Sequence, residues 1–469
     1  MTCATKRLSD PRSAAGPRGA MRALMLGVAG LALGAGMAHA QDLPFAVGEG
    51  DFSWDSYDSF AAEHDLDGQT ITVFGPWLSG EKDNFERTLM YFEQATGADV
   101  QYSGSDSFEQ QILIDAEAGS APNLAIFPQP GLAADMASRG YLTPLASEDA
   151  DWVRDNYAAG QSWVDLGTYA DADGADQFYG IFYRADLKSL VWYSPENFED
   201  AGYDVPETME DLKALTEQIA ADGETPWCIG LGSGAATGWP ATDWVEDMML
   251  RTQSPDDYDA WVTNEMPFDD PKVIAAIEEF GWFARNEDFV NGGAGAVAST
   301  DFRDSPAGLF EFPPQCYMHR QASFVPAFFP EGTVVGEDID FFYLPSYAGQ
   351  DLGKPVLGAG TVVGMTNESD GARVFLDWLK TPIAHELWMA QGAFLTAHSG
   401  VNTDTYIDDT SRRMGDIMLN ADTFRFDASD LMPGAIGAGA FWTGMVDYAG
   451  GAEAEAVAGQ IQSTWDSLK

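Results

Sequence analysis

The fold of this chain is decided by residues 70–102, TITVFGPWLSGEKDNFERTLMYFEQATGADVQY. The segment opens with a short apolar run that Gly75-Pro76 ends, which is typical of a buried strand. Residues 81–96 place apolar side chains three to four positions apart and end before Gly97, which predicts an amphipathic helix. A second short strand follows at 99–102. The segment therefore predicts one strand–helix–strand unit of an α/β fold.

The alternation of strand and helix continues along the chain. Residues 108–119 predict a helix, and 124–127 predict a third strand that stops at Pro128-Gln129-Pro130. Further strands and helices are predicted at 179–193, 209–221, 244–251, 271–283, 341–344, 356–365, 372–379 and 382–391. Such alternation favours an open, mostly parallel sheet whose ligands lie beyond the carboxyl ends of the strands. Residues 75–77 and 128–130 occupy two such ends.

The beginning of the chain has the pattern of an export signal. Met21-Arg22 is followed by an apolar, glycine-rich run, and Ala38-His39-Ala40 offers the small residues that signal peptidase accepts. We expect cleavage after Ala40, with residues 1–20 as an upstream extension. The apolar run is too short to span a bilayer, and position 41 is Gln rather than the Cys of a lipoprotein. A soluble protein that diffuses in the periplasm is predicted.

Composition narrows the class of partner. The formal charge of −50 becomes −54 once the five basic residues and the one acidic residue of 1–40 are removed. A field of this sign repels phosphate groups and anionic lipids, so neither nucleic acid nor a membrane surface is an expected partner. The remaining length suffices for two packed cores, which predicts two lobes. Cys228 and Cys316 form an even pair in an oxidising compartment, which predicts a disulfide, with two buried thiols as the alternative.

The sequence lacks motifs for catalysis, cofactors and metals. The histidines after residue 40 have no metal-binding spacing. Asp171, Asp173 and Asp176 around Gly174 resemble a fragment of a calcium loop, but the other ligand positions do not follow, so a solvated turn is expected, with a structural calcium ion as the alternative. No phosphate-binding loop, dinucleotide fingerprint or nucleophile elbow occurs. We therefore expect no cofactor, no metal and no enzyme activity. A glycoside hydrolase stays open as an alternative, because two carboxylates suffice for that reaction.

Aromatic residues beside Gly and Pro are the positive signal for a site. Trp77 follows the first strand, Trp239 and Trp244 flank Asp243 in SGAATGWPATDW, and Trp442 lies in GAGAFWTGM. The apolar faces of sugar rings stack on such side chains, while sugar hydroxyls need fixed polar partners. Since Gly and Pro favour turns, we expect these rings on loops that border a site. Burial in the core is the alternative for each of them.

Four longer segments of the chain are ITVFGPWLSGEKDNFERTLMYFEQATGADV, APNLAIFPQPG, FYRADLKSLVWYSP and LGAGTVVGMTNESDGARVFLDWLKTPIAHELWMAQGAFLTAHSGV. These segments resemble a known family, the extracellular solute-binding proteins of carbohydrate ABC importers. Within that family (family 1) the chain resembles the periplasmic α-glucoside-binding proteins, over nearly its whole length after the signal.

The resemblance implies a two-lobe periplasmic-binding-protein fold of type II, with hinge crossings near Arg184, Pro345 and His398. Both Cys228 and Cys316 then fall in the second lobe, which is consistent with a bridge. The implied division is 1–40 signal peptide with N-terminal extension, 41–184 and 346–398 first lobe, 185–345 and 399–469 second lobe.

The resemblance also implies a function and a set of contacts. The chain would capture an α-glucoside such as maltose, sucrose or trehalose in the periplasm, act as a monomer, and deliver the sugar to ABC permease subunits. AFWTGM resembles the segment that places an aromatic ring on maltodextrin, and CYMHRQASF stands where relatives bring a strand end to the cleft. Stacking is expected from Trp77, Trp239 and Trp442, and hydrogen bonding from Gln129, Asp243, Arg320 and Gln321. A secreted glycoside hydrolase and a sugar-sensing receptor subunit remain the alternative functions.

Overall fold

The computed structural model describes residues 43–158, 160–419 and 423–468. The predicted signal peptide and its cleavage after Ala40 therefore lie outside the described residues. No helix in the described ranges is long and apolar enough to cross a membrane.

A six-stranded sheet forms the first lobe, with the order β11-β10-β3-β1-β2 and β6 paired to β10. Its strands are β1 (Thr70–Gly75), β2 (Asp99–Gly104), β3 (Leu124–Phe127), β6 (Gly180–Leu187), β10 (Pro355–Met365) and β11 (Thr423–Phe426). β1 runs parallel to both β2 and β3, whereas β10 runs antiparallel to β3 and β6. The first three strands were predicted from their apolar runs, and the structure confirms all three.

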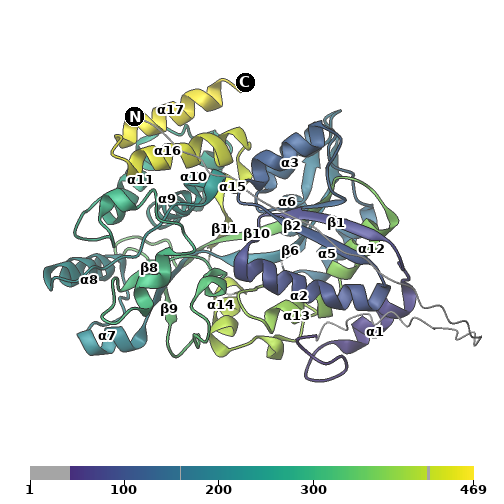
Figure 1. Ribbon diagram of the computed structural model, residues 1–469. Coiled ribbons are helices and arrows are strands. Elements are labelled where there is room, and N and C mark those ends of the chain that lie inside the picture. Colours follow the sequence, from purple (N-terminus) through teal and green to yellow (C-terminus); the bar gives the residue numbers. More distant parts are fainter. Residues whose placement is uncertain (1–42, 159, 420–422, 469) are drawn as a thin grey trace, which may run out of the picture. The chain divides into compact units, whose positions relative to one another are not determined.

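Two helices connect the parallel strands on opposite faces of this sheet. α2 (Ser79–Thr96) joins β1 to its neighbour β2, and α3 (Phe108–Glu117) returns past β1 to β3. These two connections run in opposite directions across the sheet. Because each parallel crossover is right-handed, the helices must cover opposite faces, and Figure 1 shows them there. The other helices of this lobe are α1 (Trp54–Glu63), α4 (Pro130–Ser138), α5 (Ser147–Asn156), α6 (Gly160–Leu166), α12 (Asp370–Leu379), α13 (Pro382–Met389), η5 (Thr403–Thr405) and α14 (Asp409–Leu419).

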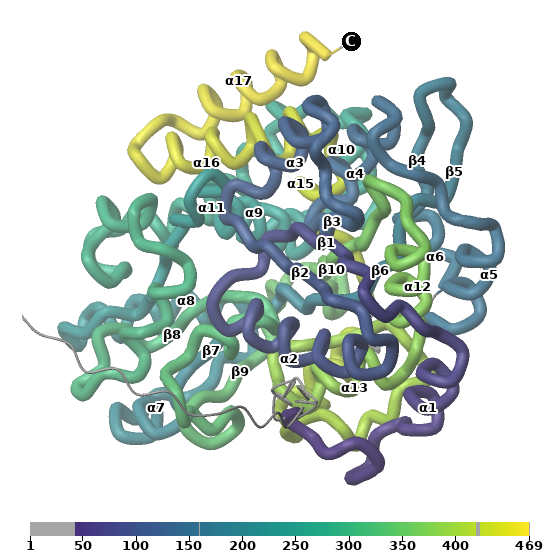
Figure 2. Tube along the Cα trace, turned by 45° about the vertical axis from the view of Figure 1, so that its right-hand side comes forward, coloured from purple at the N-terminus to yellow at the C-terminus, as the bar shows by residue number. Residues whose placement is uncertain are grey.

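The second lobe is built on a three-stranded antiparallel sheet of order β8-β7-β9. Its strands are β7 (Leu190–Tyr193), β8 (Met318–Arg320) and β9 (Asp340–Tyr343). Its helices are α7 (Pro195–Ala201), α8 (Met209–Ala221), η1 (Gly234–Ala236), α9 (Trp239–Thr252), α10 (Pro255–Val262), α11 (Pro271–Ala284), η2 (Ala294–Ala296), η3 (Ser305–Phe310), η4 (Val325–Phe328), α15 (Ala428–Leu431), η6 (Ala435–Phe441), α16 (Trp442–Ala449) and α17 (Ala454–Asp466). Figure 2 shows the C-terminal helices α16 and α17 beside α11 and α9, which they contact.

Most predicted helices are present, and one segment corrects the prediction. Residues 209–221 form α8, and Thr208 caps it by accepting the N–H of Asp211 at 3.1 Å, as the sequence indicated. Trp239 was expected on a turn, but it begins α9. Gly238 has φ 117° and Pro240 occupies the first turn of the helix, so Gly and Pro here mark the start of a helix rather than a loop.

Two smaller predictions concern a turn and a disulfide. Asp171 lies in the turn between β4 (Thr168–Ala170) and β5 (Asp176–Phe178), where its carboxylate accepts the N–H groups of Asp173 and Ala175, both at 2.9 Å. The side chain thus stabilises its own turn, as a solvated turn requires. Cys228 and Cys316 form a disulfide, which confirms that prediction.

Within the described ranges, the chain passes between the two sheets at three places. The first passage is Lys188-Ser189 between β6 and β7, the second is 344–354 between β9 and β10, and the third is Asp427 between β11 and α15. The resemblance placed crossings near Arg184, Pro345 and His398. The backbone of His398 pairs with that of Tyr157, and β11, further along the chain, pairs with β10 of the first sheet.

Candidate functional site

The carboxyl ends of β1 and β3 meet at one edge of the first sheet. Trp77 follows β1 and Gln129 follows β3, and the two strands are parallel neighbours. The antiparallel strand β10 brings Thr361 to the same edge, and Thr361 is the register partner of Arg184 in β6. The order 2-1-3 makes this edge a topological switch point, where open α/β sheets bind ligands.

A cleft of about 790 Å³, partly open to solvent, lies at this edge and continues onto the second lobe. The first lobe contributes mostly strand ends and helix starts, and the second lobe contributes α9, the loops around η1 and η4, and the start of α16. The lining residues are Pro76, Trp77, Glu81, Ser105, Asp106, Glu109, Pro128, Gln129, Arg184, Asp186, Lys188, Ser233, Ala236, Trp239, Asp243, Phe302, Arg303, Phe324, Ala359, Gly360, Thr361, Asp427, Ser429, Asp430 and Trp442.

Several buried polar atoms that belong to these lining residues have no hydrogen-bond partner in the described protein. They include Trp77 Nε1, Gln129 Oε1, Thr361 Oγ1 and Trp442 Nε1. A buried donor or acceptor without a partner costs about 1–3 kcal/mol, so such atoms are retained where a ligand can satisfy them. These atoms include hydrogen-bond donors, an acceptor and a hydroxyl group. A ligand with many hydroxyl groups can pair with all of them, because each hydroxyl both donates and accepts hydrogen bonds.

The three predicted tryptophans of the cleft differ in their exposure. Trp77 and Trp442 are almost completely buried, at 1% and 4% relative exposure. Trp239 is half-buried, with Phe302 packed edge-on at 4.8 Å between ring centroids. Trp239 therefore offers a ring face, while the other two offer chiefly their Nε1–H groups. Trp244 does not reach the cleft, because it is buried against Trp227 and Phe283 in the core of the second lobe.

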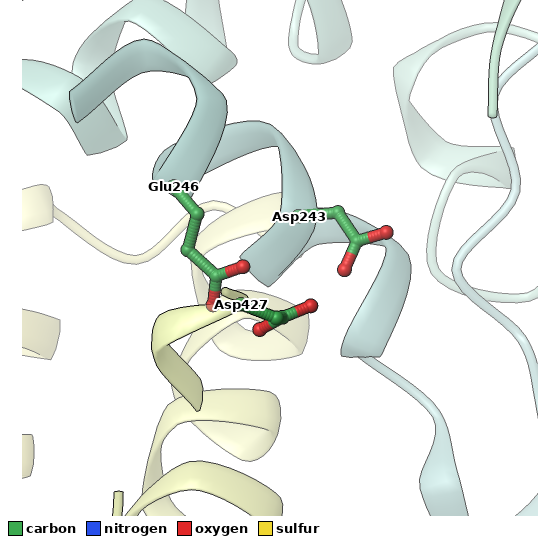
Figure 3. Close-up of side chains that lie close together, drawn as sticks. All are labelled: Asp243, Glu246 and Asp427. Atoms are coloured by element: carbon green, nitrogen blue, oxygen red, sulfur yellow. The ribbon is translucent and has the colours of Figure 1, made fainter. Parts of the chain in front are cut away.

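A buried network of charged side chains lies beneath the cleft. Lys188 of the first passage donates to Asp243 of α9 at 2.8 Å and also to Asp427, which forms the third passage. All three side chains are at most 7% exposed. Figure 3 shows Asp243 and Glu246 on the same helix, with Asp427 facing them from a separate segment. One ammonium group therefore ties two passages to the second lobe.

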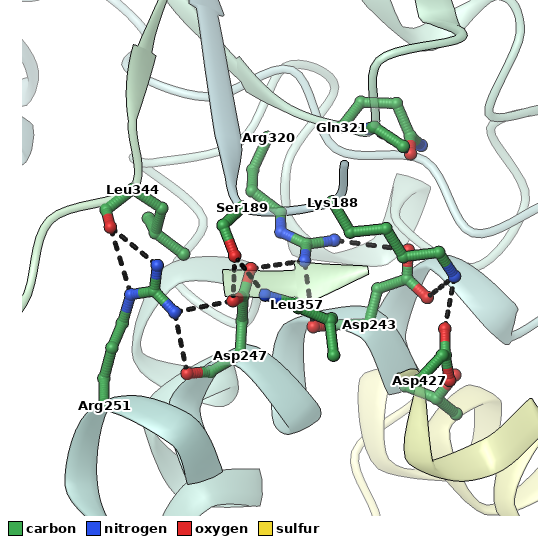
Figure 4. A network of polar contacts seen from close by, with 12 residues as sticks. Lys188, Ser189, Asp243, Asp247, Arg251, Arg320, Gln321, Leu344, Leu357 and Asp427 are labelled. Atoms are coloured by element: carbon green, nitrogen blue, oxygen red, sulfur yellow. Dashed lines mark hydrogen bonds and ion pairs between the residues drawn. The ribbon is translucent and has the colours of Figure 1, made fainter. Parts of the chain in front are cut away.

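The network continues to the second passage through two arginines. Arg320 donates to Asp247 at 2.5 Å and to the backbone oxygen of Asp243 at 3.0 Å. Arg251 donates to the other carboxylate oxygen of Asp247 at 2.5 Å and to the Leu344 carbonyl at 2.7 Å (Figure 4). Trp239, Asp243, Asp247 and Arg251 are spaced four residues apart, so one face of α9 carries the series.

Burial and neighbouring charges shift the pKa values of these carboxyl groups in different directions. Burial raises the pKa of Asp243 to about 7, against the opposing effect of Lys188. Burial and the adjacent Asp427, with which Glu246 shares a hydrogen bond, raise the pKa of Glu246 well above its ordinary value. Burial also opposes ionisation of Asp427, but Lys188 and these hydrogen bonds hold its pKa below the usual range.

Asp243, Glu246 and Asp427 bring carboxylate oxygens within 4.8 Å of one another, a spacing that could hold a metal ion. The ammonium of Lys188 already binds two of these carboxylates, those of Asp243 and Asp427, and the raised pKa of Glu246 disfavours its charged form. The donor set therefore fits the built-in cation of Lys188 and does not fit a metal.

The structure brings five of the seven predicted contact residues together around the cleft, namely Trp77, Gln129, Trp239, Asp243 and Trp442. Arg320 and Gln321 do not line it. Arg320 lies beneath Asp243, and the Gln321 side chain accepts the N–H of Ala322 at 2.9 Å.

Sequence reasoning missed most of the charged lining residues. A signal was available in FYRADLKS, where Arg184, Asp186 and Lys188 alternate through an otherwise apolar run. Alternate residues of a strand share a face, and all three line the cleft. No comparable pattern marks Asp427 or Asp430, which reach the cleft only because the chain returns there after β11.

Two lobes, three passages between them and a cleft lined by both lobes define a two-lobe ligand-binding protein of the periplasmic binding protein class. The chain belongs to the bacterial extracellular solute-binding protein family, whose model matches residues 77–386.

Two relatives in sequence cover most of the chain. The alpha-glucosides-binding periplasmic protein AglE of Rhizobium meliloti (strain 1021) is 61% identical over 96% of this chain and 100% of that protein. The osmoprotective compounds-binding protein GgtB of Synechocystis is 43% identical over 86% of this chain and 93% of that protein.

Solved structures show the same fold. The bacterial solute receptor AcbH, described as preferring β-D-galactopyranose, superposes with a TM-score of 0.73 at 18% identity, over 85% of this chain and 99% of that chain. Maltose-bound MalE3 of T. maritima superposes with a TM-score of 0.68 at 14% identity, over 86% of this chain and 100% of that chain.

Proposed function

We propose that this protein captures α-glucosides or related neutral oligosaccharides in the periplasm and delivers them to the membrane subunits of an ABC importer. The cleft carries the proposal, because it combines tryptophan rings with unpartnered buried polar atoms from both lobes. The substrate class is supported by the relative named for α-glucosides, which is similar along its whole length. No chemical step is part of the proposal.

Within the cleft we assign a role to each predicted residue. The half-exposed ring of Trp239 stacks on a sugar face, and Trp77 and Trp442 donate through Nε1. Gln129 accepts through Oε1, and Asp243 accepts from a hydroxyl while it remains paired with Lys188. Arg320 acts indirectly, as the residue that positions Asp243.

The lobe limits belong to the proposal as well. The first lobe comprises the segments on the six-stranded sheet, and the second comprises those on the three-stranded sheet together with α15 to α17. Residues 399–419 and 423–426 then belong to the first lobe, because β11 pairs with β10. We also propose a monomer whose signal peptide is cleaved after Ala40. Light scattering tests the monomer, and N-terminal sequencing of the exported protein tests the cleavage site.

Calorimetric titration with maltose, sucrose and trehalose tests the proposed function, with a polyamine and an amino acid as controls. Trp239→Ala should weaken binding of the preferred sugar by about 2 kcal/mol, roughly 30-fold, because burial and stacking are both lost. The matched control is Trp282→Ala, since Trp282 lies in the same lobe and does not line the cleft. Heat from the polyamine alone would refute the sugar assignment, and glucose released from a bound disaccharide over hours would support the hydrolase instead.

A further inference from the structure

One wall of the cleft carries acidic side chains that have no cationic partner. We call it the acidic wall and define it as Asp106, Glu109, Gln129 and Asp430. Asp106 and Glu109 lie before and at the start of α3, Gln129 precedes α4, and Asp430 lies in α15. The backbone of α15 approaches closely, since a Cβ on Gly131 would stand 2.9 Å from the Asp430 carbonyl oxygen.

Other carboxylates of the cleft are compensated. Glu81 and Asp186 pair with Arg184 at 2.7 and 3.2 Å, and Lys188 pairs with Asp243 and Asp427. Across the described residues, no Lys, Arg or His lies within ion-pair distance of the three acids of the wall. The acids of the wall therefore have no ion-pair partner within the described protein.

Gln129 is an independent observation that points to a ligand. Its side chain is 6% exposed, its Nε2 donates to Glu109 at 3.1 Å, and its Oε1 has no partner. The amide thus uses its donor on the wall and presents an acceptor to the cleft. A carbonyl oxygen beside carboxyl groups favours a ligand group that only donates hydrogen bonds, and an ammonium group is such a donor.

The two inner acids of the wall are also destabilised in their charged form. Burial raises the pKa of Glu109, and Asp106 adds to that effect. Burial also raises the pKa of Asp430 well above its usual value; Asp427, Asp243 and Glu109 reinforce the shift and Lys188 opposes it. A cation bound at the wall would lower both pKa values and so release protons.

We propose that the acidic wall binds an ammonium substituent on a sugar ring, so that the protein captures amino-substituted α-glucosides as well as neutral ones and rejects glucosides that carry a carboxylate. This inference rests on the proposed function, because the rest of the ligand occupies the same cleft.

The experiment uses the exported full-length protein and calorimetric titration at about pH 6, where an amino sugar is charged. The probes are trehalose, trehaloses in which an amino group replaces one hydroxyl group at a time, and the corresponding glucuronic acid derivative. We expect one amino derivative to bind about tenfold more tightly than trehalose, the effect of one charge-assisted hydrogen bond. Its heat should vary with the buffer's ionisation enthalpy, because binding releases protons, whereas the heat for trehalose should vary less.

Two isosteric variants locate the effect. Glu109→Gln and Asp430→Asn should each reduce the preference for the amino derivative over trehalose about tenfold, because each removes a carboxyl group from the wall. Glu117→Gln, at the exposed end of the same helix as Glu109, should leave that preference unchanged.

The outcomes separate the two proposals. If trehalose, maltose or sucrose binds but every amino derivative binds no more tightly than trehalose, the acidic wall has no ammonium site and the proposed function stands. The ammonium site is equally refuted if the preference persists in both variants. If no glucoside of any kind binds, both proposals fail.

Discussion

Lys188→Met should be among the most damaging single substitutions, because it removes a cation that two buried carboxylates share. Lys188 lies in the first passage and binds Asp243 and Asp427 with 7% of its side chain exposed. Met keeps the length of the aliphatic chain, so the change removes mainly the charge and its hydrogen bonds.

The magnitude follows from the partners that remain. Removing one member of a buried ion pair costs about 3–5 kcal/mol, since the other charge stays buried without compensation. Asp243 keeps Arg320, and Asp427 keeps the hydroxyl of Ser429 at 2.8 Å. We therefore expect the free energy of unfolding to fall by about 4 kcal/mol at pH 8.

The loss should depend on pH in a defined direction. Without Lys188, the pKa values of Asp243 and Asp427 in the folded protein rise. The folded variant therefore binds protons more readily than the unfolded variant does. A raised folded pKa gives stability that is present below the unfolded Asp value of about 3.9 and lost as pH rises through the folded pKa. Since the pKa of Asp243 is already about 7 in the native protein, the deficit of the variant should be larger at pH 8 than at about pH 5.5.

Urea unfolding followed by circular dichroism at both pH values measures this deficit. The control is Lys82→Met, whose exposed partner Glu86 lies at 3.5 Å, and which should cost less than about 1 kcal/mol. A Lys188→Met deficit as small as that of the control, or one that does not grow with pH, would contradict the assignment of Lys188 as the central cation.

Three further predictions follow from the same structure. The double substitution Cys228→Ser with Cys316→Ser removes the disulfide, whose two cysteines are 88 positions apart in the sequence. The unfolded chain then gains conformational entropy, so the free energy of unfolding should fall by on the order of 4 kcal/mol in the chain-entropy model, measured by thermal unfolding with and without reductant. Burial lowers the pKa of His385 well below its usual value, so its stability contribution is complete above about pH 6.5 and is lost as pH falls below it; His385→Gln should flatten the stability curve there, and an unchanged curve would exclude this residue. Gly80→Ala should weaken sugar binding without unfolding the protein, because the new Cβ would lie 2.2 Å from the carbonyl oxygen of Ala327 in η4 and would push α2 and η4 apart, whereas Gly459→Ala, with open space around it, should not.

Local patterns were sufficient for most of the elements. β1 and β3 follow from short apolar runs, and α8 follows from its apolar periodicity and its capping residue. Each of these signals involves only residues that are close in sequence. The tryptophans show where this reasoning ends. Trp239 and Trp244 share one short segment, yet one borders the cleft and the other is buried between Trp227 and Phe283, because the two side chains leave α9 on different faces.

The sequence by itself determined the alternation of strand and helix and the place of Trp77 and Gln129 at strand ends, and it predicted the disulfide between Cys228 and Cys316, with two buried thiols as the alternative. These features depend on periodicity, on residues that end strands, and on a cysteine count that leaves one pair. Only the tertiary structure decided that Lys188, Asp243 and Asp427 share one buried charge network, and that the acids of the wall have no cation beside them. Residues separated by more than 200 positions meet there, and their charge state depends on burial and neighbours that no local pattern specifies.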